Sequence, residues 1–489
     1  MTLDSNTCYR ALRSRDARFD GRFYVAVSST RIYCRPVCTV KPPKRENCRF
    51  YPSAAAAESG GFRPCLRCRP ELAPGNASVD ATSRLAQAAA SLIEDRVLDE
   101  AGLDAVAARL GITGRHLRRA FGAEFGVAPV EFAQTQRLLL AKRLLTDTAL
   151  PVTEIAFASG FGSLRRFNAL FKQRYRLQPS RLRKRMNADR GANRAVNGPS
   201  ASDALHFELS FRPPYDWPTV SAFLAARAIA GVEAVEDGRY LRTARISVEG
   251  KEHRGWIEVS PSPKKPALRV AVSASLAKAL PPVLSRVKAL MDLSCNPAEV
   301  AAALGALAKR HPGLRVPGAF DGFEIAVRAI LGQQVTVAAA RTVAGRIAAA
   351  FGDPVETPFA ALTTVFPAAE RIADVPYGRI ARLGMPGSRA RTVLALARAV
   401  ADGELDLMPN ADIDATLDRL RALPGIGEWT AQYIAMRALA WPDAFPHTDL
   451  GVMKALGETS PKRVLEAGEA WRPWRAYAVM HLWQSLTRE

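Results

Sequence analysis

Long apolar runs and an apolar leader are missing from this chain of 489 residues. No stretch approaches the roughly 20 apolar residues that cross a bilayer. The first 15 residues are polar and charged where a secretory signal needs an apolar centre. We therefore expect a cytoplasmic protein without membrane contact. Its length and its 48% hydrophobic content are sufficient for about three or four domains.

Acidic residues are scarce relative to basic ones. The chain has 47 Asp and Glu against 68 Lys and Arg, which gives a net charge of +21. Residues 1–200 hold 34 of the basic and 17 of the acidic residues, so most of the excess charge lies there. A local basic excess favours a polyanionic partner such as DNA, because binding releases counterions from the phosphates. Charge alone also fits an arginine-rich surface without such a partner.

Cysteine is nearly absent beyond residue 68, where only Cys295 remains. The other six are Cys8, Cys34, Cys38, Cys48, Cys65 and Cys68. In a cytoplasmic chain such a cluster favours a metal over disulfides. Two pairs have three and two intervening residues, and 26 residues separate them, which predicts one tetrahedral zinc with four cysteine ligands. The spacing taken alone favours a purely structural site, and Cys48 is expected to be a small buried residue.

The residues around these cysteines carry a more specific signal. They read TRIYCRPVC from Thr30, RENCRFY from Arg45 and GFRPCLRC from Gly61. These segments resemble the metal-binding domain of the Ada family, whose members repair methyl phosphotriesters in DNA by irreversible methyl transfer to the first zinc cysteine. The resemblance implies that Cys34 is the methyl acceptor. It also implies that one zinc ion is bound by Cys34, Cys38, Cys65 and Cys68.

Methyl transfer would change the charge of this site. A thiolate becomes a thioether, so one negative charge is lost beside Arg35, Arg63 and Arg67. DNA is then repelled less, and the neighbouring arginines are expected to supply phosphate contacts. The zinc domain is thus predicted to be a sensor whose affinity for DNA rises after damage.

Residues 81–185 have a helical pattern that contains a duplicated unit. In each copy an amphipathic helix, at 103–107 and at 152–156, is followed by a glycine-containing turn and a second helix with Thr113 or Ser163 as its N-cap. The pattern resembles the AraC family, in which two helix-turn-helix units place recognition helices in successive major grooves. The expected DNA-binding side chains are Arg115, Arg118, Arg119, Arg165, Arg166 and Asn168. Solvated helix faces without a DNA role are the alternative.

A glycine-rich turn, LPGIGEWTA from Leu423, leads into a predicted helix. Gly425 and Gly427 would let the backbone approach a phosphate, which then binds N–H groups at the helix N-terminus. The segment PHTDLG from Pro446 follows and places Asp449 just before an apolar helix. Taken singly, the turn could be an ordinary helix connection and Asp449 a plain N-cap.

Together these two segments resemble the helix-hairpin-helix glycosylases, in particular the AlkA-like 3-methyladenine DNA glycosylase II branch, over about residues 205–489. The resemblance implies that Asp449 is the catalytic carboxylate and that Gly425, Gly427 and Thr430 bind DNA. Cleavage of an N-glycosidic bond builds positive charge on the sugar, which a carboxylate stabilises while it orients water. The expected substrate is an alkylated base of the 3-methyladenine type.

Aromatic residues near these segments are expected to form the substrate pocket. Trp429, Tyr433 and Trp483 would stack on a flipped cationic base, although aromatics at such spacing are also typical of a core. The segment LGQQV from Leu331 matches the part that inserts into the duplex, so Gln333 and Gln334 are expected to contact DNA.

Three sequence absences refine the expected chemistry. Trp429 occupies the place where lyase-competent relatives carry a lysine, and no four-cysteine cluster follows the hairpin, so a monofunctional glycosylase without an iron–sulfur cluster is expected. The only late cysteine, Cys295, lies in SCN rather than in a Pro-Cys-His motif. Repair of alkylated guanine oxygen by a second acceptor cysteine is therefore not expected.

The predicted fold is multidomain. It has a small α+β zinc domain over 1–76, an all-α double helix-turn-helix over 80–187, a linker over 188–203, an α+β subdomain over 204–316 and an all-α helix-hairpin-helix glycosylase domain over 317–489. Strands are expected near 206–211, 246–248, 255–259 and 267–272.

The predicted function is repair of DNA alkylation coupled to its regulation. Double-stranded DNA is the expected partner, RNA polymerase is a further partner of an activator, and a monomer is expected. One alternative is a transcription regulator with a catalytically silent glycosylase-like domain. A second is a structural zinc module that targets a constitutive glycosylase and leaves Cys34 inert.

Overall fold

The computed structural model describes residues 4–75, 81–95, 97–148, 150–184, 204–248, 250–409 and 412–487. The linker expected over 188–203 lies outside these residues. The chain divides into two compact units. Unit 1 comprises Met1–Arg212, Ile246–His253 and Ser262–Ser285, and unit 2 comprises Pro213–Arg245, Arg254–Pro261 and Arg286–Glu489. Among the described residues, no helix has the length and apolar character needed to cross a membrane.

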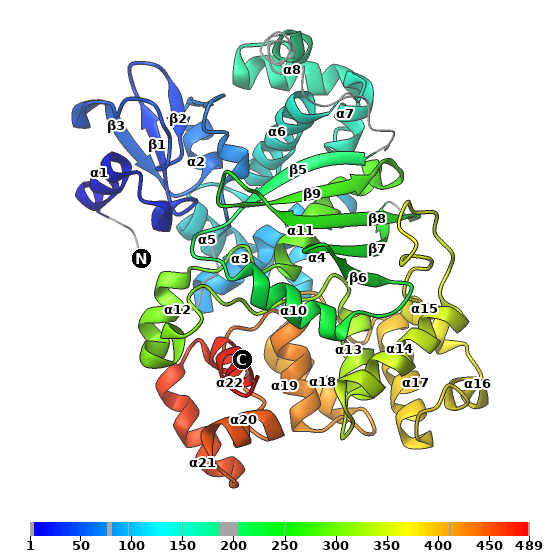
Figure 1. Cartoon of the computed structure of the whole chain (residues 1–489). Helices are drawn as coiled ribbons and strands as arrows, with labels where there is room; N and C mark the ends of the chain where they lie inside the picture. The colour runs from blue at the N-terminus through cyan, green and yellow to red at the C-terminus, as the bar shows by residue number, and fades with distance from the viewer. Residues whose placement is uncertain are drawn as a thin grey trace. The chain divides into compact units, whose positions relative to one another are not determined.

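Unit 1 begins with a small sheet in the strand order β3-β1-β2-β4 (Figure 1, in blue). Its elements are α1 (Ser5–Ser14), β1 (Tyr24–Val27), β2 (Ile32–Cys34), β3 (Cys48–Tyr51), α2 (Ala54–Ser59) and β4 (Arg63–Pro64). The parallel pairing of β2 with β4 places Tyr33 opposite Pro64, and Cys65 N donates to Tyr33 O at 3.0 Å. This pairing brings the segments of Cys34 and Cys65 together at one end of the sheet.

Six helices of unit 1 contain the two predicted helix-turn-helix repeats. They are α3 (Ala81–Glu94), α4 (Val97–Arg109), α5 (Gly114–Phe125), α6 (Pro129–Asp147), α7 (Val152–Ala158) and α8 (Leu164–Tyr175). Thr113 accepts a hydrogen bond from His116 N, and Ser163 accepts one from Arg166 N, which confirms both predicted N-caps. Gly102, with φ at 79°, interrupts α4 immediately before the segment that the sequence predicts as helical.

The zinc-domain segment and helix α6 share buried contacts. Leu139 of α6 packs into the same apolar cluster as Tyr33. Lys142, which is 1% exposed, donates to Glu71 at 2.6 Å and to Cys65 O at 3.5 Å. The segment that carries Cys65 is therefore attached directly to the long helix of the DNA-binding module.

A buried carboxyl group, that of Glu58 on α2, lies at this junction. It accepts hydrogen bonds from the Tyr33 hydroxyl at 3.0 Å and from the Thr135 hydroxyl of α6 at 3.4 Å. Burial raises the pKa of Glu58 from 4.5 to about 7, although both hydrogen bonds and the charge of Arg174 oppose the shift. The folded protein therefore holds a proton here that the unfolded chain releases at lower pH.

We expect Glu58→Gln to change how stability depends on pH. The stabilising effect of this proton is complete below about pH 4.5 and is lost as the pH rises to about 7. Above about pH 7 the wild type therefore loses about 3 kcal/mol of stability that the glutamine variant, which cannot ionise, retains. Urea unfolding at about pH 5 and about pH 8, read by hydrogen exchange of peptides from α2, measures this difference. Glu46→Gln, at a glutamate whose side chain is 73% exposed, is the control. A Glu58→Gln effect of equal size at both pH values would contradict the assignment.

A second sheet has the strand order β5-β9-β8-β7-β6. Its strands are β5 (Ala204–Ser210), β6 (Glu233–Glu236), β7 (Arg239–Val248), β8 (Lys251–Pro261) and β9 (Ala267–Ser273). These include the four predicted strands, but β6 and the first half of β7 were not predicted. Their buried side chains include Glu233 and Arg242, whose N···O distance is 3.6 Å, so the sequence shows charged residues where a core strand is expected to be apolar.

The remaining helices are α10 to α22, and those from α13 onward confirm the all-α fold predicted for residues 317–489. The helices are α10 (Trp217–Arg227), α11 (Leu280–Leu290), α12 (Pro297–Leu304), α13 (Gly322–Leu331), α14 (Val337–Phe351), α15 (Ala369–Ala373), α16 (Tyr377–Ala381), α17 (Gly387–Ala401), α18 (Ile413–Ala422), α19 (Glu428–Arg437), α20 (Leu450–Leu456), α21 (Pro461–Gly468) and α22 (Arg475–Ser485). Helices α18 and α19 flank the predicted hairpin, and α20 follows Asp449 directly.

Candidate metal centre and active site

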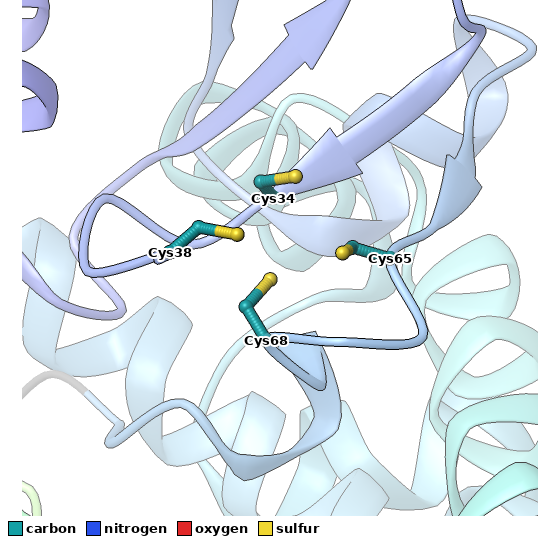
Figure 2. Close-up of side chains that lie close together, drawn as sticks. All are labelled: Cys34, Cys38, Cys65 and Cys68. Atoms are coloured by element: carbon teal, nitrogen blue, oxygen red, sulfur yellow. The ribbon is translucent and has the colours of Figure 1, made fainter. Parts of the chain in front are cut away.

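Four cysteines converge at the end of the small sheet. The sulfur atoms of Cys34, Cys38, Cys65 and Cys68 all lie within 4.8 Å of one another. Figure 2 shows the four side chains pointing toward a common centre, from the end of β2 and from the loops that follow β2 and β4. Four thiols at this spacing are a donor set suited to tetrahedral zinc. The clustering predicted from the sequence spacing is confirmed.

Backbone N–H groups surround the sulfur atoms. Arg35 N donates to Cys68 Sγ at 3.4 Å. The sulfurs of Cys38 and Cys65 receive hydrogen bonds from the backbone of Val40 and Cys68. Such donors stabilise the negative charge of thiolates, which supports a site built for a metal rather than for neutral thiols.

The arginines next to the cysteines differ in accessibility. Arg35 is 8% exposed and pairs with Asp20 through two hydrogen bonds, so it is neutralised and unavailable to a phosphate. This corrects the expectation that all three neighbouring arginines face DNA. Arg63 is half-buried and Arg67 is exposed. No local pattern predicts this difference, because Asp20 lies fifteen residues before Arg35.

The other cysteines of the zinc domain are not part of the cluster. Cys48 is 6% exposed and packs with Cys8 and Phe23 in a separate apolar core. The Cys48 thiol donates to Lys44 O at 3.3 Å. Its predicted role as a small buried residue is confirmed.

The recognition-helix candidates lie on exposed faces. Arg115, Arg118, Arg119, Arg165, Arg166 and Asn168 are all exposed. Leu117 and Phe121 of α5 and Phe167 and Phe171 of α8 are 0% exposed, so each helix buries one apolar face and presents a polar one.

Asp449 caps helix α20 and also holds two indole groups. Its Oδ1 accepts hydrogen bonds from Val452 N at 2.9 Å and from Trp483 Nε1 at 2.8 Å, and its Oδ2 accepts one from Trp429 Nε1 at 2.8 Å. A Cβ atom at Gly451 would lie 3.0 Å from both Asp449 Oδ1 and Trp483 Cδ1, so a larger residue there would push the indole and the carboxylate out of place. The two expected roles, N-cap and functional carboxylate, are therefore compatible.

Four partly exposed aromatic rings form a cluster, and two of them, Trp429 and Trp483, contact this carboxylate. The rings of Trp429 and Tyr433 stack at 5.4 Å with an interplanar angle of 22°, and Tyr433 lies 6.3 Å from Trp483. Phe223 of α10 stacks on Trp483 at 6.4 Å and 13°. The three predicted aromatics are thus brought together. Phe223 was missed, because no sequence signal connects it with residues about two hundred positions later.

The hairpin between α18 and α19 is joined to the loop after α13. Gln333 Nε2 donates to Gly425 O at 2.8 Å and to Thr430 Oγ1 at 2.9 Å. Gly425 has φ at 82°, and a Cβ there would lie 2.3 Å from the Thr392 hydroxyl, so both its conformation and its surroundings require glycine. Thr430 is 2% exposed, so its side chain lies inside the protein, where its hydroxyl accepts the hydrogen bond from Gln333.

The tip of this loop presents two exposed residues. Gln334 is exposed with φ at 53°, and Val335 is 39% exposed. Gln334 is the residue that the sequence predicts to contact DNA, and Val335 beside it is an exposed apolar side chain of the kind that can insert between bases.

Four protein families match consecutive parts of the chain. They are described as the metal binding domain of Ada at residues 7–71, a helix-turn-helix domain at 106–185, the AlkA N-terminal domain at 206–321 and the HhH-GPD superfamily base excision DNA repair protein at 327–462. With the first of these matches, the four clustered cysteines constitute a single zinc site.

Whole proteins resemble the chain over different lengths. The "Probable bifunctional transcriptional activator/DNA repair enzyme AlkA" of Mycobacterium tuberculosis is 40% identical over 99% of this chain and 97% of its own length. The "DNA-3-methyladenine glycosylase 2" of Escherichia coli is 37% identical over 57% of this chain and 96% of its own length. The Escherichia coli "Bifunctional transcriptional activator/DNA repair enzyme Ada" is 36% identical over 30% of this chain and 39% of its own length.

Proposed function

Because the chain belongs to the family of bifunctional transcriptional activator/DNA repair enzymes AlkA, we propose that it combines two activities in the response to DNA alkylation. Unit 2 excises alkylated bases of the 3-methyladenine type by hydrolysis of the N-glycosidic bond. Unit 1 accepts a methyl group from methyl phosphotriesters and binds promoter DNA. The observation that carries the proposal is the Asp449 carboxylate, held by two indole N–H groups within the aromatic cluster.

Asp449 acts on the reaction through its charge. Three N–H donors occupy its oxygens and fix them in place, so the carboxylate is a poor nucleophile but a well-positioned anion. When the bond between the sugar and the base breaks, the electron pair stays on the base nitrogen and positive charge develops on the sugar. The carboxylate stabilises that charge, and water adds to the sugar carbon and gives its proton to solvent. A base that is already cationic leaves as a neutral molecule.

The enzyme is proposed to be monofunctional. Trp429, rather than a lysine, occupies the first turn of α19, and its indole donates to Asp449 instead of attacking the sugar. The test is incubation with duplex DNA that contains 3-methyladenine. We expect free base and an abasic site, with strand breaks only after alkali. Strand cleavage without alkali would contradict the monofunctional assignment, and absence of base release would favour a regulator with a silent glycosylase-like domain.

DNA is proposed to be held by the hairpin between α18 and α19 and by the loop that is hydrogen-bonded to it. Backbone N–H groups at the start of α19, after Gly425 and Gly427, would bind a phosphate. Gln333 fixes the loop to that hairpin, while Gln334 and Val335 at its tip would enter the duplex at the vacated base. Val335 is proposed as the wedge because it is exposed and apolar.

The metal site is proposed to accept the methyl group at Cys34. Zinc, when bound by Cys34, Cys38, Cys65 and Cys68, keeps these thiols deprotonated at neutral pH. Cys34 Sγ attacks the methyl carbon of the phosphotriester. A carbon–sulfur bond forms, and the carbon–oxygen bond breaks with its electron pair on the phosphate. Backbone N–H groups directed at the other three sulfurs lower the charge density on them, which supports Cys34 as the acceptor.

The methylated site is proposed to increase DNA affinity. Loss of one negative charge strengthens the field of Arg67 and Arg63, while Arg35 stays paired with Asp20. The exposed faces of α5 and α8 would then read promoter bases. We further propose contact with RNA polymerase and a monomeric state, since one chain supplies both helix-turn-helix units.

A further inference from the structure

Two arginines flank the aromatic cluster of unit 2, of which Arg437 is buried and Arg227 is half-buried. Arg227 lies one helical turn after Phe223 on α10, with its guanidinium carbon 3.7 Å from the centre of the Phe223 ring. Arg437 lies one turn after Tyr433 on α19, and its guanidinium carbon is 5.0 Å from the Phe223 ring and 5.8 Å from the Tyr433 ring. Two positive charges are unexpected next to a site for cationic bases, because they repel such a base.

The arginines also meet at the Tyr433 hydroxyl. Arg437 Nη1 donates to it at 3.0 Å, and the positive charge of Arg227 also acts on it. A guanidinium group has no acceptor, so the phenolic proton must point elsewhere. Among the described residues, no acceptor for that proton is found. Tyr433 is therefore a hydrogen-bond donor whose ring stacks on that of Trp429, the residue that donates to Asp449.

The charge of the arginines strengthens this donor. Burial by itself would raise the pKa of Tyr433, but the charges of Arg437 and Arg227 and the hydrogen bond from Arg437 outweigh it and lower the pKa. Arg437 is held in place, since it also donates to Pro317 O and to Gly318 O and is 3% exposed. The charge is thus a fixed part of the site.

We infer that Arg227 and Arg437, acting through the Tyr433 hydroxyl, extend excision to uncharged damaged purines whose base leaves as an anion. When a neutral base departs, the electron pair of the broken bond leaves it negatively charged. The hydroxyl donates a hydrogen bond to that base, and the two guanidinium groups stabilise the negative charge. A cationic base leaves neutral and gains nothing from them. The arginines are therefore specificity-determining residues, and the inference rests on the proposed glycosylase activity.

The test compares two bases of different charge in matched duplexes: hypoxanthine, which is neutral, and 7-methylguanine, which is cationic. Single-turnover rates at saturating enzyme are measured for wild type, Arg437→Met, Arg437→Lys and Arg227→Met. We expect each methionine variant to lower the ratio of hypoxanthine to 7-methylguanine rates at least about tenfold, and Arg437→Lys to restore most of it. Arg227→Met leaves the hydrogen bonds of Arg437 to the backbone intact. It therefore tests the inference even if Arg437→Met does not fold.

Arg286→Met is the matched control. Arg286 also lies over a phenylalanine ring and donates to a backbone carbonyl, but its ring is Phe320, outside the aromatic cluster. For Arg286→Met, the ratio of hypoxanthine to 7-methylguanine rates is expected to equal that of the wild type. An unchanged ratio in both methionine variants, or a wild type that releases 7-methylguanine but no hypoxanthine, would overturn the inference alone. A wild type that releases neither base would overturn the proposed function as well.

Discussion

Replacement of Asp449 by asparagine lowers the single-turnover rate of 3-methyladenine release by about a hundred- to a thousandfold or more. The change removes the negative charge and one hydrogen-bond acceptor, because the amide nitrogen of asparagine cannot accept from the Trp429 indole. Asparagine caps a helix as well as aspartate does, so the hydrogen bond from Val452 N and the start of α20 are retained. What is lost is the anion that stabilises positive charge on the sugar. The rate is measured under saturating enzyme, so that DNA binding does not limit it.

A second capping aspartate provides the control for this variant. Asp321 accepts a hydrogen bond from Glu324 N at the start of α13, but it does not contact the aromatic cluster. Asp321→Asn is expected to retain the wild-type rate. If Asp449→Asn releases base as fast as Asp321→Asn does, the carboxylate has no part in the reaction and Asp449 is only an N-cap.

Cys34→Ser abolishes methyl transfer from a methyl phosphotriester. A serine hydroxyl is not ionised at neutral pH, whereas a zinc thiolate is, so the variant lacks the nucleophile. The measurement is the intact mass of the protein after incubation with DNA that carries the phosphotriester, followed by peptide mapping. Wild type is expected to gain the mass of one methylene group, located on Cys34.

Cys48→Ala separates this chemistry from ordinary cysteine reactivity. Cys48 is buried in the neighbouring apolar core and lies outside the zinc cluster, so this variant is expected to gain the methyl group like the wild type. A methyl group found on Cys68, the one partly exposed member of the cluster, would reassign the acceptor. A wild type that gains none would make the zinc site structural.

The features predicted well from the sequence are those with local signals. Thr113 and Ser163 were identified as N-caps because capping depends on residues three positions away. The cysteine spacing predicted a cluster, and the pairing of β2 with β4 brings the two cysteine pairs together. Trp429 and Tyr433 are one turn apart on α19, so their stacking also followed from local geometry.

The features missed depend on contacts between distant segments. Phe223, Arg227 and Arg437 reach one site from α10 and α19, which no spacing in the sequence reveals. Arg35 was expected to face DNA because the sequence does not show that it is buried against Asp20, a contact formed only in the folded structure. Strand β6 and the start of β7 were missed for a related reason, since a buried ion pair replaces the apolar alternation that marks a core strand.

We propose that one chain both removes alkylated bases and records alkylation of the DNA backbone. The most direct test incubates the wild-type protein with one methylated duplex that carries 3-methyladenine and methyl phosphotriesters, then measures free bases and the intact mass of the protein in the same sample. We expect free 3-methyladenine together with a protein that is heavier by one methylene group on Cys34. Free base with an unmodified protein, or a modified protein with no free base, would contradict it.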